Sequence, residues 1–211
     1  MDKFPPLKLR IALVIYELLW WLILPFALLY LRRRGTSDPD YARHIGERFG
    51  RHIGTFKHPV WVHAVSLGEM RSATPLIRAL LARGEVVLTT HFTPAGRREA
   101  IREFGPEIAA GQVQTVWVPF ELGVAYRRFL CHFTPKYGLV MEIEIWPRMI
   151  MACRKHDVPL FMCNAQYPQK SFDKDTQGLA LRAALLAGFA GGFVKSDDQR
   201  SRFAAAGMTN I

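Results

Sequence analysis

The sequence predicts a fold of the α/β class. From residue 58 onward, short runs rich in β-branched residues alternate with helical patterns of about 10–15 residues. These runs are continuously apolar, as expected of parallel strands that are buried on both faces. The first 34 residues contain one long apolar segment of a different character. We therefore expect a Rossmann-like, mostly parallel sheet with helices on both faces, preceded by an N-terminal membrane-anchor helix.

The apolar segment covers residues 11–30, and Glu17 is its only charged residue. About 20 apolar residues can cross a hydrocarbon core as a helix. A cleaved signal peptide does not fit, because arginines 32–34 follow in place of a small-residue cleavage site. A buried globular helix and a membrane anchor remain open, and Glu17 and Pro25 allow the anchor either to span the membrane or to lie in its interface. The arginines predict that the following residues lie on the cytoplasmic side.

Three regions follow from this pattern. Residues 1–34 form the anchor and its basic flank, residues 35–57 form a basic juxtamembrane segment, and residues 58–211 form the α/β domain. Basic residues beside a membrane attract anionic headgroups, at about 1 kcal/mol for each charge. We expect the juxtamembrane segment to lie against the lipid surface.

The elements of the α/β domain follow in order. Strands are expected at residues 60–66, 86–90, 113–119, 138–146, 158–164 and 191–196. Helices are expected at residues 68–83, 96–104, 121–132, 147–155 and 174–186, and a last helix begins near Asp197. The alternation of strands and helices stops at Ile211, just after a helix, so we expect the chain to be half of a longer protein.

Composition narrows the class of protein. The 211 residues are 50% hydrophobic, which excludes a disordered tail and a small disulfide scaffold. The three cysteines form no paired motif, so a reducing compartment fits best. The formal charge of +10 predicts an anionic partner. Because the positive charge gathers beside the apolar segment and no nucleic-acid motif is present, lipid is favoured over nucleic acid.

Glu69 is the first candidate for chemistry. It follows the strand at 60–66 and the turn residue Gly68, in the first turn of a helix. Ligands of open α/β sheets bind outside the carboxyl ends of the strands. The helix N-terminus favours a charged carboxylate, which can accept a proton from a substrate hydroxyl. Two interpretations remain open: a general base, or an ordinary acidic residue of a first helical turn.

Glu142 and Glu144 are the second candidates. They are two positions apart near the end of the strand at 138–146, so they share one of its faces. Acids are costly inside a buried strand, so we expect both at its lip, either near a ligand or simply solvated. His63 and His91 are expected to be hydrogen-bonded core residues, and Asn164 either binds a ligand or caps a turn. The sequence has no dinucleotide fingerprint, no P-loop and no metal-ligand cluster.

Six blocks of the sequence, taken together, resemble a known family. They are residues 41–50, 61–69, 93–96, 118–122, 141–147 and 164–165, in this order along the chain. The set resembles the 3-deoxy-D-manno-octulosonic acid (Kdo) transferases of Gram-negative bacteria, glycosyltransferase family 30. The resemblance implies a two-domain enzyme of the GT-B type. Such an enzyme transfers Kdo from CMP-Kdo to the lipid A precursor, lipid IVA, at the cytoplasmic face of the inner membrane, without a metal ion or another cofactor.

The resemblance also implies roles for individual residues. Glu69 would be the general base and Glu142 would stabilise the transition state. The residues implied in acceptor binding are Arg43, Glu47, Arg48, Ser66, Gly68 and Thr93. The chain would be the acceptor-binding half, and CMP-Kdo would bind only with the C-terminal domain that is absent here. A fragment, a truncated gene product and a half that needs a partner remain open, as do an inactive fragment and a membrane-bound glycolipid-binding module.

Overall fold

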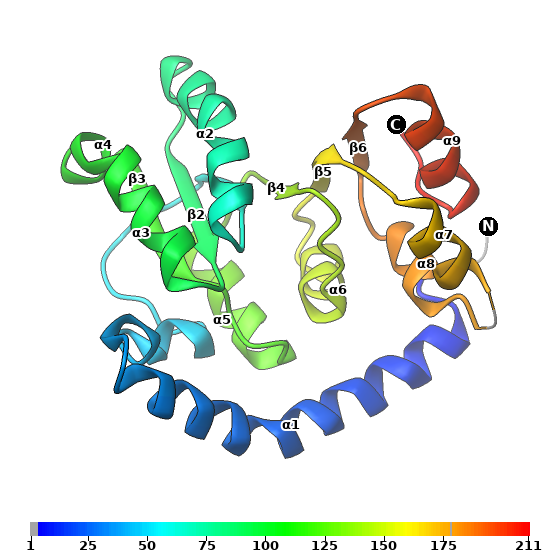
Figure 1. Cartoon of the computed structure of the whole chain (residues 1–211), viewed down its shortest axis with the longest axis horizontal. Helices are drawn as coiled ribbons and strands as arrows, with labels where there is room; N and C mark the ends of the chain where they lie inside the picture. The colour runs from blue at the N-terminus through cyan, green and yellow to red at the C-terminus, as the bar shows by residue number, and fades with distance from the viewer. Residues whose placement is uncertain (1–3, 178) are drawn as a thin grey trace.

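A computed structural model describes residues 4–177 and 179–211 and contains one six-stranded parallel sheet (Figure 1). The strand order is β3-β2-β1-β4-β5-β6, and every neighbouring pair is parallel. The strands are β1 (Val60–His63), β2 (Val87–His91), β3 (Val113–Trp117), β4 (Tyr137–Met141), β5 (Leu160–Ala165) and β6 (Gly191–Val194). The α/β class and the parallel sheet that the sequence predicts are confirmed.

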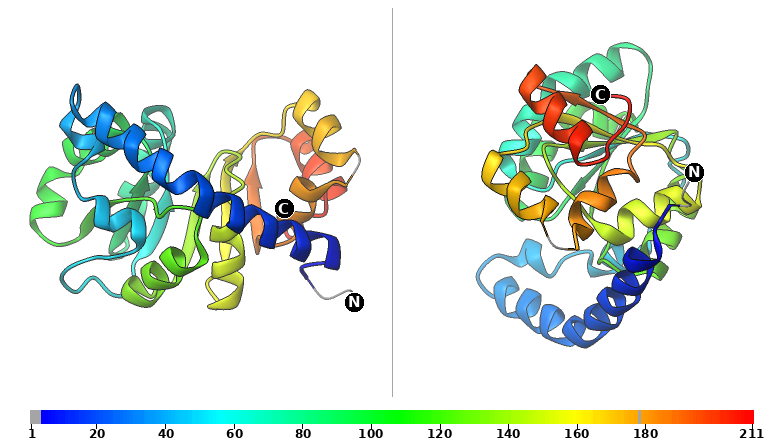
Figure 2. Two further views of the ribbon diagram at one scale, coloured as in Figure 1. Left: turned by 90° about the horizontal axis from the view of Figure 1, so that it is seen from below. Right: turned by 90° about the vertical axis from the view of Figure 1, so that its right-hand side faces the viewer.

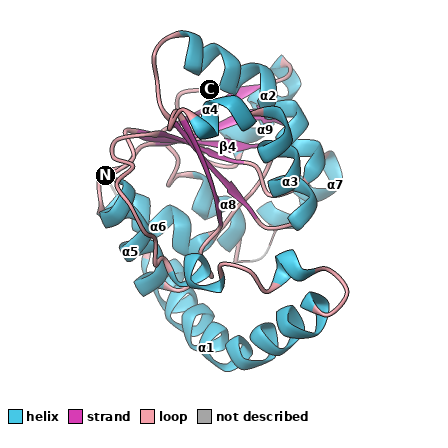
Figure 3. Ribbon diagram, turned by 90° about the vertical axis from the view of Figure 1, so that its left-hand side faces the viewer, coloured by secondary structure: helices cyan, strands magenta, loops and turns pink. Residues whose placement is uncertain are grey.

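Helices cover both faces of this sheet, as Figure 3 shows. One apolar core lies between the sheet and α2 and α3, and a larger one lies beneath α5, α6 and α8. The helices are α2 (Leu67–Ala82), α3 (Pro94–Glu103), α4 (Gly105–Ala109), α5 (Gly123–Phe133), α6 (Pro147–Lys155), α7 (Gln169–Thr176), α8 (Leu181–Leu186) and α9 (Asp197–Ala205). The sheet is therefore buried from two sides, which explains why its strands are continuously apolar.

The strand order reverses between β1 and β4, which lie side by side at the centre of the sheet. The chain runs outward from β1 through β2 to β3, returns to β4, and then runs outward to β6. The loops that leave β1 and β4 consequently diverge at the carboxyl edge. This switch point is where open α/β sheets bind ligands.

The N-terminal helix α1 (Leu7–Gly35) bows beneath the domain (Figure 1). Its buried residues are few, namely Leu9, Leu13, Leu24 and Leu31, and they pack into cores shared with the domain. The large apolar residues on the rest of its surface are exposed, for example Leu22 at 68% and Phe26 at 72%. A fully buried globular helix is therefore wrong. By length and composition, α1 is the helix among the described residues that is able to cross a membrane.

Two 3-10 helices, η1 (Pro39–Tyr41) and η2 (Ile45–Phe49), connect α1 to the domain. Gly50 ends η2 with a φ of 71°, in the left-handed region that favours glycine. A Cβ at Gly50 would lie 2.1 Å from the carbonyl oxygen of Ala125. The juxtamembrane segment is thus packed directly on α5.

The structure corrects two expected elements and adds one that was not expected. The strand expected at 138–146 ends at Met141, because Glu142 has a φ of 58° and turns the chain out of the sheet. Glu142 and Glu144 therefore do not share a strand face. The single helix expected at 174–186 is two helices, α7 and α8, and residue 178 between them lies outside the described residues. The short helix α4 was not expected.

Candidate active site at the carboxyl edge of the sheet

Three loops converge at the carboxyl edge of the central strands. The first leaves β1 and leads through Ser66 to α2, the second leaves β2 and leads through Thr93 to α3, and the third leaves β4 and leads through residues 142–146 to α6. Gly96, in the first turn of α3, permits a close approach between the first two loops. A Cβ there would lie 3.0 Å from the carbonyl carbon of Ser66.

The Glu69 carboxylate is held in place by the loop that precedes it. Its Oε2 accepts a hydrogen bond from the backbone N–H of Val65 at 2.7 Å, and its Oε1 accepts one from the Ser66 hydroxyl at 3.0 Å. Ser66 in turn accepts from the backbone N–H of Glu69 at 3.3 Å, which makes it the N-cap of α2. This reciprocal arrangement is a variant of the capping box, because the backbone N–H that Glu69 accepts from belongs to Val65, one residue before the N-cap. Glu69 is therefore a helix-start residue whose carboxylate is also fixed in orientation.

The electrostatic setting of Glu69 differs from the expectation. The helix N-terminus was expected to favour the charged form, but the pKa of Glu69 is raised, chiefly because burial disfavours the carboxylate. The hydrogen bonds from Val65 and Ser66 oppose this shift, and the negative charges of Glu144 and Glu142 add to it. A carboxylate with a raised pKa holds a proton more strongly, so it is better suited to accept one from a hydroxyl.

Glu142 and Glu144 reach this edge from the loop after β4. Glu142 is exposed, and its backbone N–H donates to the carbonyl of Cys163 at 2.9 Å, which ties the loop to β5. Its left-handed backbone is uncommon for a residue with a side chain, and such conformations cluster at functional sites. Glu144 accepts a hydrogen bond from the Trp146 indole at 2.5 Å, and burial raises its pKa.

The structure thus brings three carboxylates, Glu69, Glu142 and Glu144, within electrostatic range of one another. They do not form a metal cage: among residues 4–177 and 179–211, no three His, Cys, Asp or Glu side chains are arranged to hold a metal ion.

Aromatic rings and two histidines form the floor behind these carboxylates. Trp146 packs edge-on against His63 with ring centres 5.5 Å apart, and it lies 6.0 Å from the ring of Phe92. His63 is fully buried and shares a 2.8 Å hydrogen bond with Thr90, and burial lowers its pKa to about 3. His91 is buried in the same way. Both histidines are core residues, as the sequence predicted.

Arg48 is the most unusual of the residues implied in acceptor binding. Its side chain is buried, and the guanidinium donates to the carbonyl of Phe92 at 3.2 Å and lies 4.5 Å from the ring centre of Trp117. Burial and the nearby Arg97 lower its pKa to about 10. Within the described part of the chain, its Nε atom has no hydrogen-bond partner. A buried cation with unused hydrogen-bonding capacity favours an anionic ligand.

Arg48 and Thr93 line the same cavity, which has a volume of about 230 Å³. Helix α1 supplies one wall through Trp20, Ala27, Tyr30 and Leu31, and Phe92, Phe120 and Tyr41 complete the lining. The Thr93 hydroxyl donates to the carbonyl of Val65 at 3.2 Å and accepts from the N–H of Gly96 at 3.3 Å, so it also caps α3. Helix α1 therefore forms part of the cavity around Arg48 and Thr93.

The other implied acceptor residues occupy different places. Glu47 forms a two-pronged ion pair with Arg97, at 2.9 and 3.2 Å, and accepts from the backbone N–H of Trp117, so it braces η2 against β3. Arg43 is exposed, pairs with Asp40 at 3.1 Å and lines a separate hollow of about 180 Å³. Gly68 is exposed, and the space around it is open.

Sequence reasoning missed several residues of this site. Phe92 and Trp117 surround Arg48, but neither was singled out, because their contact joins β2, β3 and η2 in space. Glu121 was missed as well. It is buried and accepts from the N–H groups of Arg148 and Met149 at 2.7 and 3.2 Å, so it caps α6 directly after the carboxylate loop. The available signal was an acidic residue at the boundary between the strand expected at 113–119 and the helix expected at 121–132.

A parallel α/β sheet with a fixed, partly desolvated carboxylate at its switch point is typical of ligand-binding, Rossmann-type domains. Comparison with known proteins identifies which one. A family model described as "3-Deoxy-D-manno-octulosonic-acid transferase (kdotransferase)" matches residues 43–211, and the chain belongs to this family.

Individual relatives agree with this assignment. The chain is 45% identical over 150 residues to 3-deoxy-D-manno-octulosonic acid transferase of Bordetella pertussis, covering 71% of this chain and 35% of the relative. It is 30% identical over 171 residues to a probable mitochondrial 3-deoxy-D-manno-octulosonic acid transferase of Arabidopsis thaliana. This match covers 79% of this chain and 37% of the relative. The chain thus spans about a third of the length of the relatives it matches.

Proposed function

We propose that this chain is the acceptor-binding part of a glycosyltransferase of lipopolysaccharide core biosynthesis. The whole enzyme would transfer Kdo from CMP-Kdo to the lipid A precursor, lipid IVA. Membership of the Kdo transferase family supports the reaction class. The observation that carries the assignment to this domain is the fixed Glu69 carboxylate with its raised pKa at the switch point of the sheet.

In the proposed reaction, Glu69 acts as the general base. It accepts the proton of a sugar hydroxyl of the acceptor, and that oxygen attacks the anomeric carbon of Kdo while the bond to the CMP phosphate breaks. Reactions at an anomeric carbon pass through a transition state of oxocarbenium character, which is positively charged. Glu142 is exposed at the same edge, and its negative charge would stabilise that transition state. The proposal assigns no step to a metal ion or another cofactor.

The cavity lined by Arg48 and Thr93 is the proposed seat of the acceptor headgroup. Lipid A precursors carry phosphate and acyl chains, so their site needs a cation beside an apolar surface. Arg48 supplies the buried cation, and Trp20, Tyr30 and Leu31 of α1 supply the apolar wall. Arg43, Glu47, Ser66 and Gly68 would act around this cavity, Glu47 and Ser66 mainly by holding its loops in place.

We also propose that α1 lies in the plane of the membrane surface. A helix that crossed the bilayer would leave the domain, but α1 packs on the domain at both ends, through Leu9 and Leu31. The apolar residues exposed along α1 can enter one leaflet. Arginines 32–34 at its end favour the cytoplasmic face of the inner membrane. The acceptor cavity would then open beside the lipid.

The donor site belongs to a different part of the proposed enzyme. We propose that CMP-Kdo binds mainly to the portion of the relatives that this chain does not match. Isothermal titration calorimetry of the 211-residue chain with CMP tests this point. The expected result is no saturable binding, whereas saturable binding would place a nucleotide site within the described domain.

Reconstitution tests the function itself. The chain is joined to the donor portion of the Bordetella pertussis relative and incubated with lipid IVA and CMP-Kdo, and the lipid product is examined by mass spectrometry. A mass increase of one or more Kdo units is expected. If the chimera binds lipid IVA but forms no product, the alternative of a glycolipid-binding module is favoured. In that case Glu69 would serve only at the start of α2, where it bonds with the N-cap Ser66.

A further inference from the structure

A second hollow, away from the carboxylates, lies between α1, α5 and α6. Its volume is about 690 Å³, and it shares no lining residue with the cavity around Arg48. Four cationic side chains line it: Arg127 from α5, and Arg148, Arg154 and Lys155 from α6. Among residues 4–177 and 179–211, Glu17 of α1 is the one acidic residue that lines it.

The charges in this hollow are not balanced. Glu17 pairs with Arg148 at 2.6 Å and also accepts from the N–H of Gly123 at 3.1 Å, at the start of α5. Within residues 4–177 and 179–211, Arg127, Arg154 and Lys155 have no carboxylate within 4.0 Å. Arg154 lies over the ring of Phe4, 5.7 Å from its centre, so part of the hollow is apolar.

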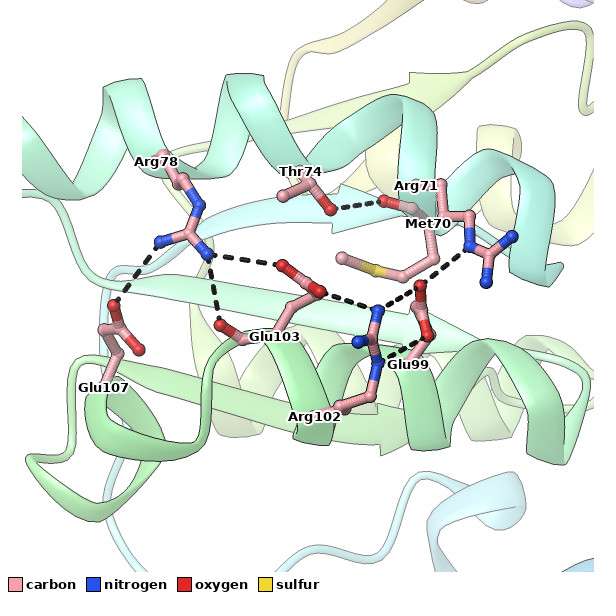
Figure 4. Close-up of polar contacts among 8 residues, drawn as sticks. All are labelled: Met70, Arg71, Thr74, Arg78, Glu99, Arg102, Glu103 and Glu107. Carbon is pink, nitrogen blue, oxygen red and sulfur yellow. Dashed lines mark hydrogen bonds and ion pairs between the residues drawn. The ribbon is translucent and has the colours of Figure 1, made fainter.

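On the opposite face of the sheet, by contrast, basic side chains are paired with carboxylates. There, Arg71, Arg78 and Arg102 all form ion pairs with carboxylates of α3 and α4, such as Glu99 (Figure 4). Helix electrostatics explain only part of this arrangement. Arg154 and Lys155 lie in the last turn of α6, where the helix dipole favours cations, whereas Arg148 is in its first turn, where the dipole opposes a positive charge.

The hollow also borders the proposed membrane surface. Val14 and Trp21 are three and four positions from Glu17, so they share its side of α1, and both are exposed. Seen from below, α5 and α6 extend from the same side of α1 (Figure 2). A ligand in the hollow would therefore have unpaired cations on one side and the apolar face of α1 on the other.

We propose that this hollow binds the phosphate-bearing headgroup of an anionic membrane lipid. The site is separate from sugar transfer, and it uses only the interfacial position of α1 from the proposed function. Arg127, Arg154 and Lys155 would contact the phosphate, and the acyl chains would follow Val14 and Trp21. A bound lipid would hold α1 against α5 and α6.

Vesicle sedimentation of the full chain tests the proposal. The probes are phosphatidylcholine vesicles with and without phosphatidylglycerol. The pocket variant is Arg127→Gln with Lys155→Gln, and the control is Arg128→Gln with Arg83→Gln. The control removes the same charge from exposed residues, one of them adjacent to Arg127, outside the hollow. The pocket variant should lose roughly tenfold in affinity for the anionic vesicles, the control should lose less than about threefold, and both should bind neutral vesicles as the unmodified chain does.

The remaining outcomes separate the alternatives. Equal losses in the two variants, or no loss in either, would overturn the proposal in favour of diffuse surface attraction or no site. Calorimetry with glycerol phosphate distinguishes the source of the phosphate. Saturable binding that the pocket variant abolishes, with unchanged vesicle affinity, would reassign the site to a soluble phosphate. Failure of every chain to bind neutral vesicles would instead contradict the interfacial position of α1.

Discussion

Glu17 of α1 and Arg148 of α6 form an ion pair at 2.6 Å, and it joins α1 to the helix that follows the carboxylate loop. Both side chains are largely shielded from solvent, with 28% and 16% exposed. The backbone N–H of Arg148 donates to Glu121, so one residue connects α1, the cap of α6 and the loop of Glu142 and Glu144. The position of α1 is thereby coupled to the geometry of the site.

Glu17→Gln should loosen this coupling. It removes the charge that faces Arg148 while Gln can still accept from Gly123, so we expect a loss of about 1–3 kcal/mol in the free energy of unfolding. For a domain of this size, that corresponds to roughly 2–4 °C in melting temperature for each kcal/mol, measured by thermal unfolding in detergent. The control is Glu85→Gln, which breaks the more exposed Lys136 pair and should cost less than about 1 kcal/mol. Equal losses of unfolding free energy in Glu17→Gln and Glu85→Gln would contradict the coupling between α1 and the site.

The apolar face of α1 should carry membrane binding. Leu22→Glu with Phe26→Glu places two charges on this face without touching the buried leucines, so the fold should survive and the chain should leave neutral vesicles. Ile53→Glu is the control, because Ile53 is 96% exposed outside α1. Retention of the double variant on vesicles would show that another surface holds the membrane.

The pH dependence of stability should contain a contribution from Glu121. Burial raises its pKa to about 7 in the folded chain, from an ordinary value of 4.5. A raised folded-state pKa means that the stabilising proton is fully present below pH 4.5 and is lost as the pH rises to about 7. Relative to Glu121→Gln, the unmodified chain should therefore lose stability between pH 5 and 7, by a few kcal/mol. Parallel melting-temperature profiles for the two chains would contradict this.

Chelation should leave the transfer rate unchanged. The proposed reaction needs a base and a positioned carboxylate, with no step through a metal ion. Treating the reconstituted chimera with EDTA and then dialysing it tests this, with the EDTA-treated donor substrate as a control. A rate that falls and returns when Mg²⁺ or Mn²⁺ is added would show that a metal takes part.

Much of the fold could be predicted, because buried parallel strands and amphipathic helices have distinct sequence periods. The end of β4 could not, since Glu142-Ile143-Glu144-Ile145 alternates like a strand. The left-handed backbone at Glu142 that ends β4 is rare for glutamate.

Some features of the candidate site could likewise be predicted from the sequence, and others could not. Glu69 could be found because it follows a strand and the turn residue Gly68, in the first turn of a helix. Its raised pKa could not, because it depends on burial and on carboxylates from a neighbouring strand's loop. The burial of Arg48 depends likewise on Phe92 and Trp117, which are distant in sequence.

The turnover of Glu69→Gln, compared with that of Ser66→Ala, tests the central claim most directly. Both variants disturb the capping box of α2, but only Glu69→Gln removes the proposed base. In the reconstituted chimera, with folding checked by circular dichroism, Glu69→Gln should lower the transfer rate by about 10²–10⁴ while lipid IVA binding changes little. Ser66→Ala should cost about 1 kcal/mol of stability and lower the rate much less than Glu69→Gln does, because it removes one of the two hydrogen bonds that orient the base and leaves the base itself. Near-normal turnover of folded Glu69→Gln, or equal rate losses in both variants, would contradict Glu69 as the base.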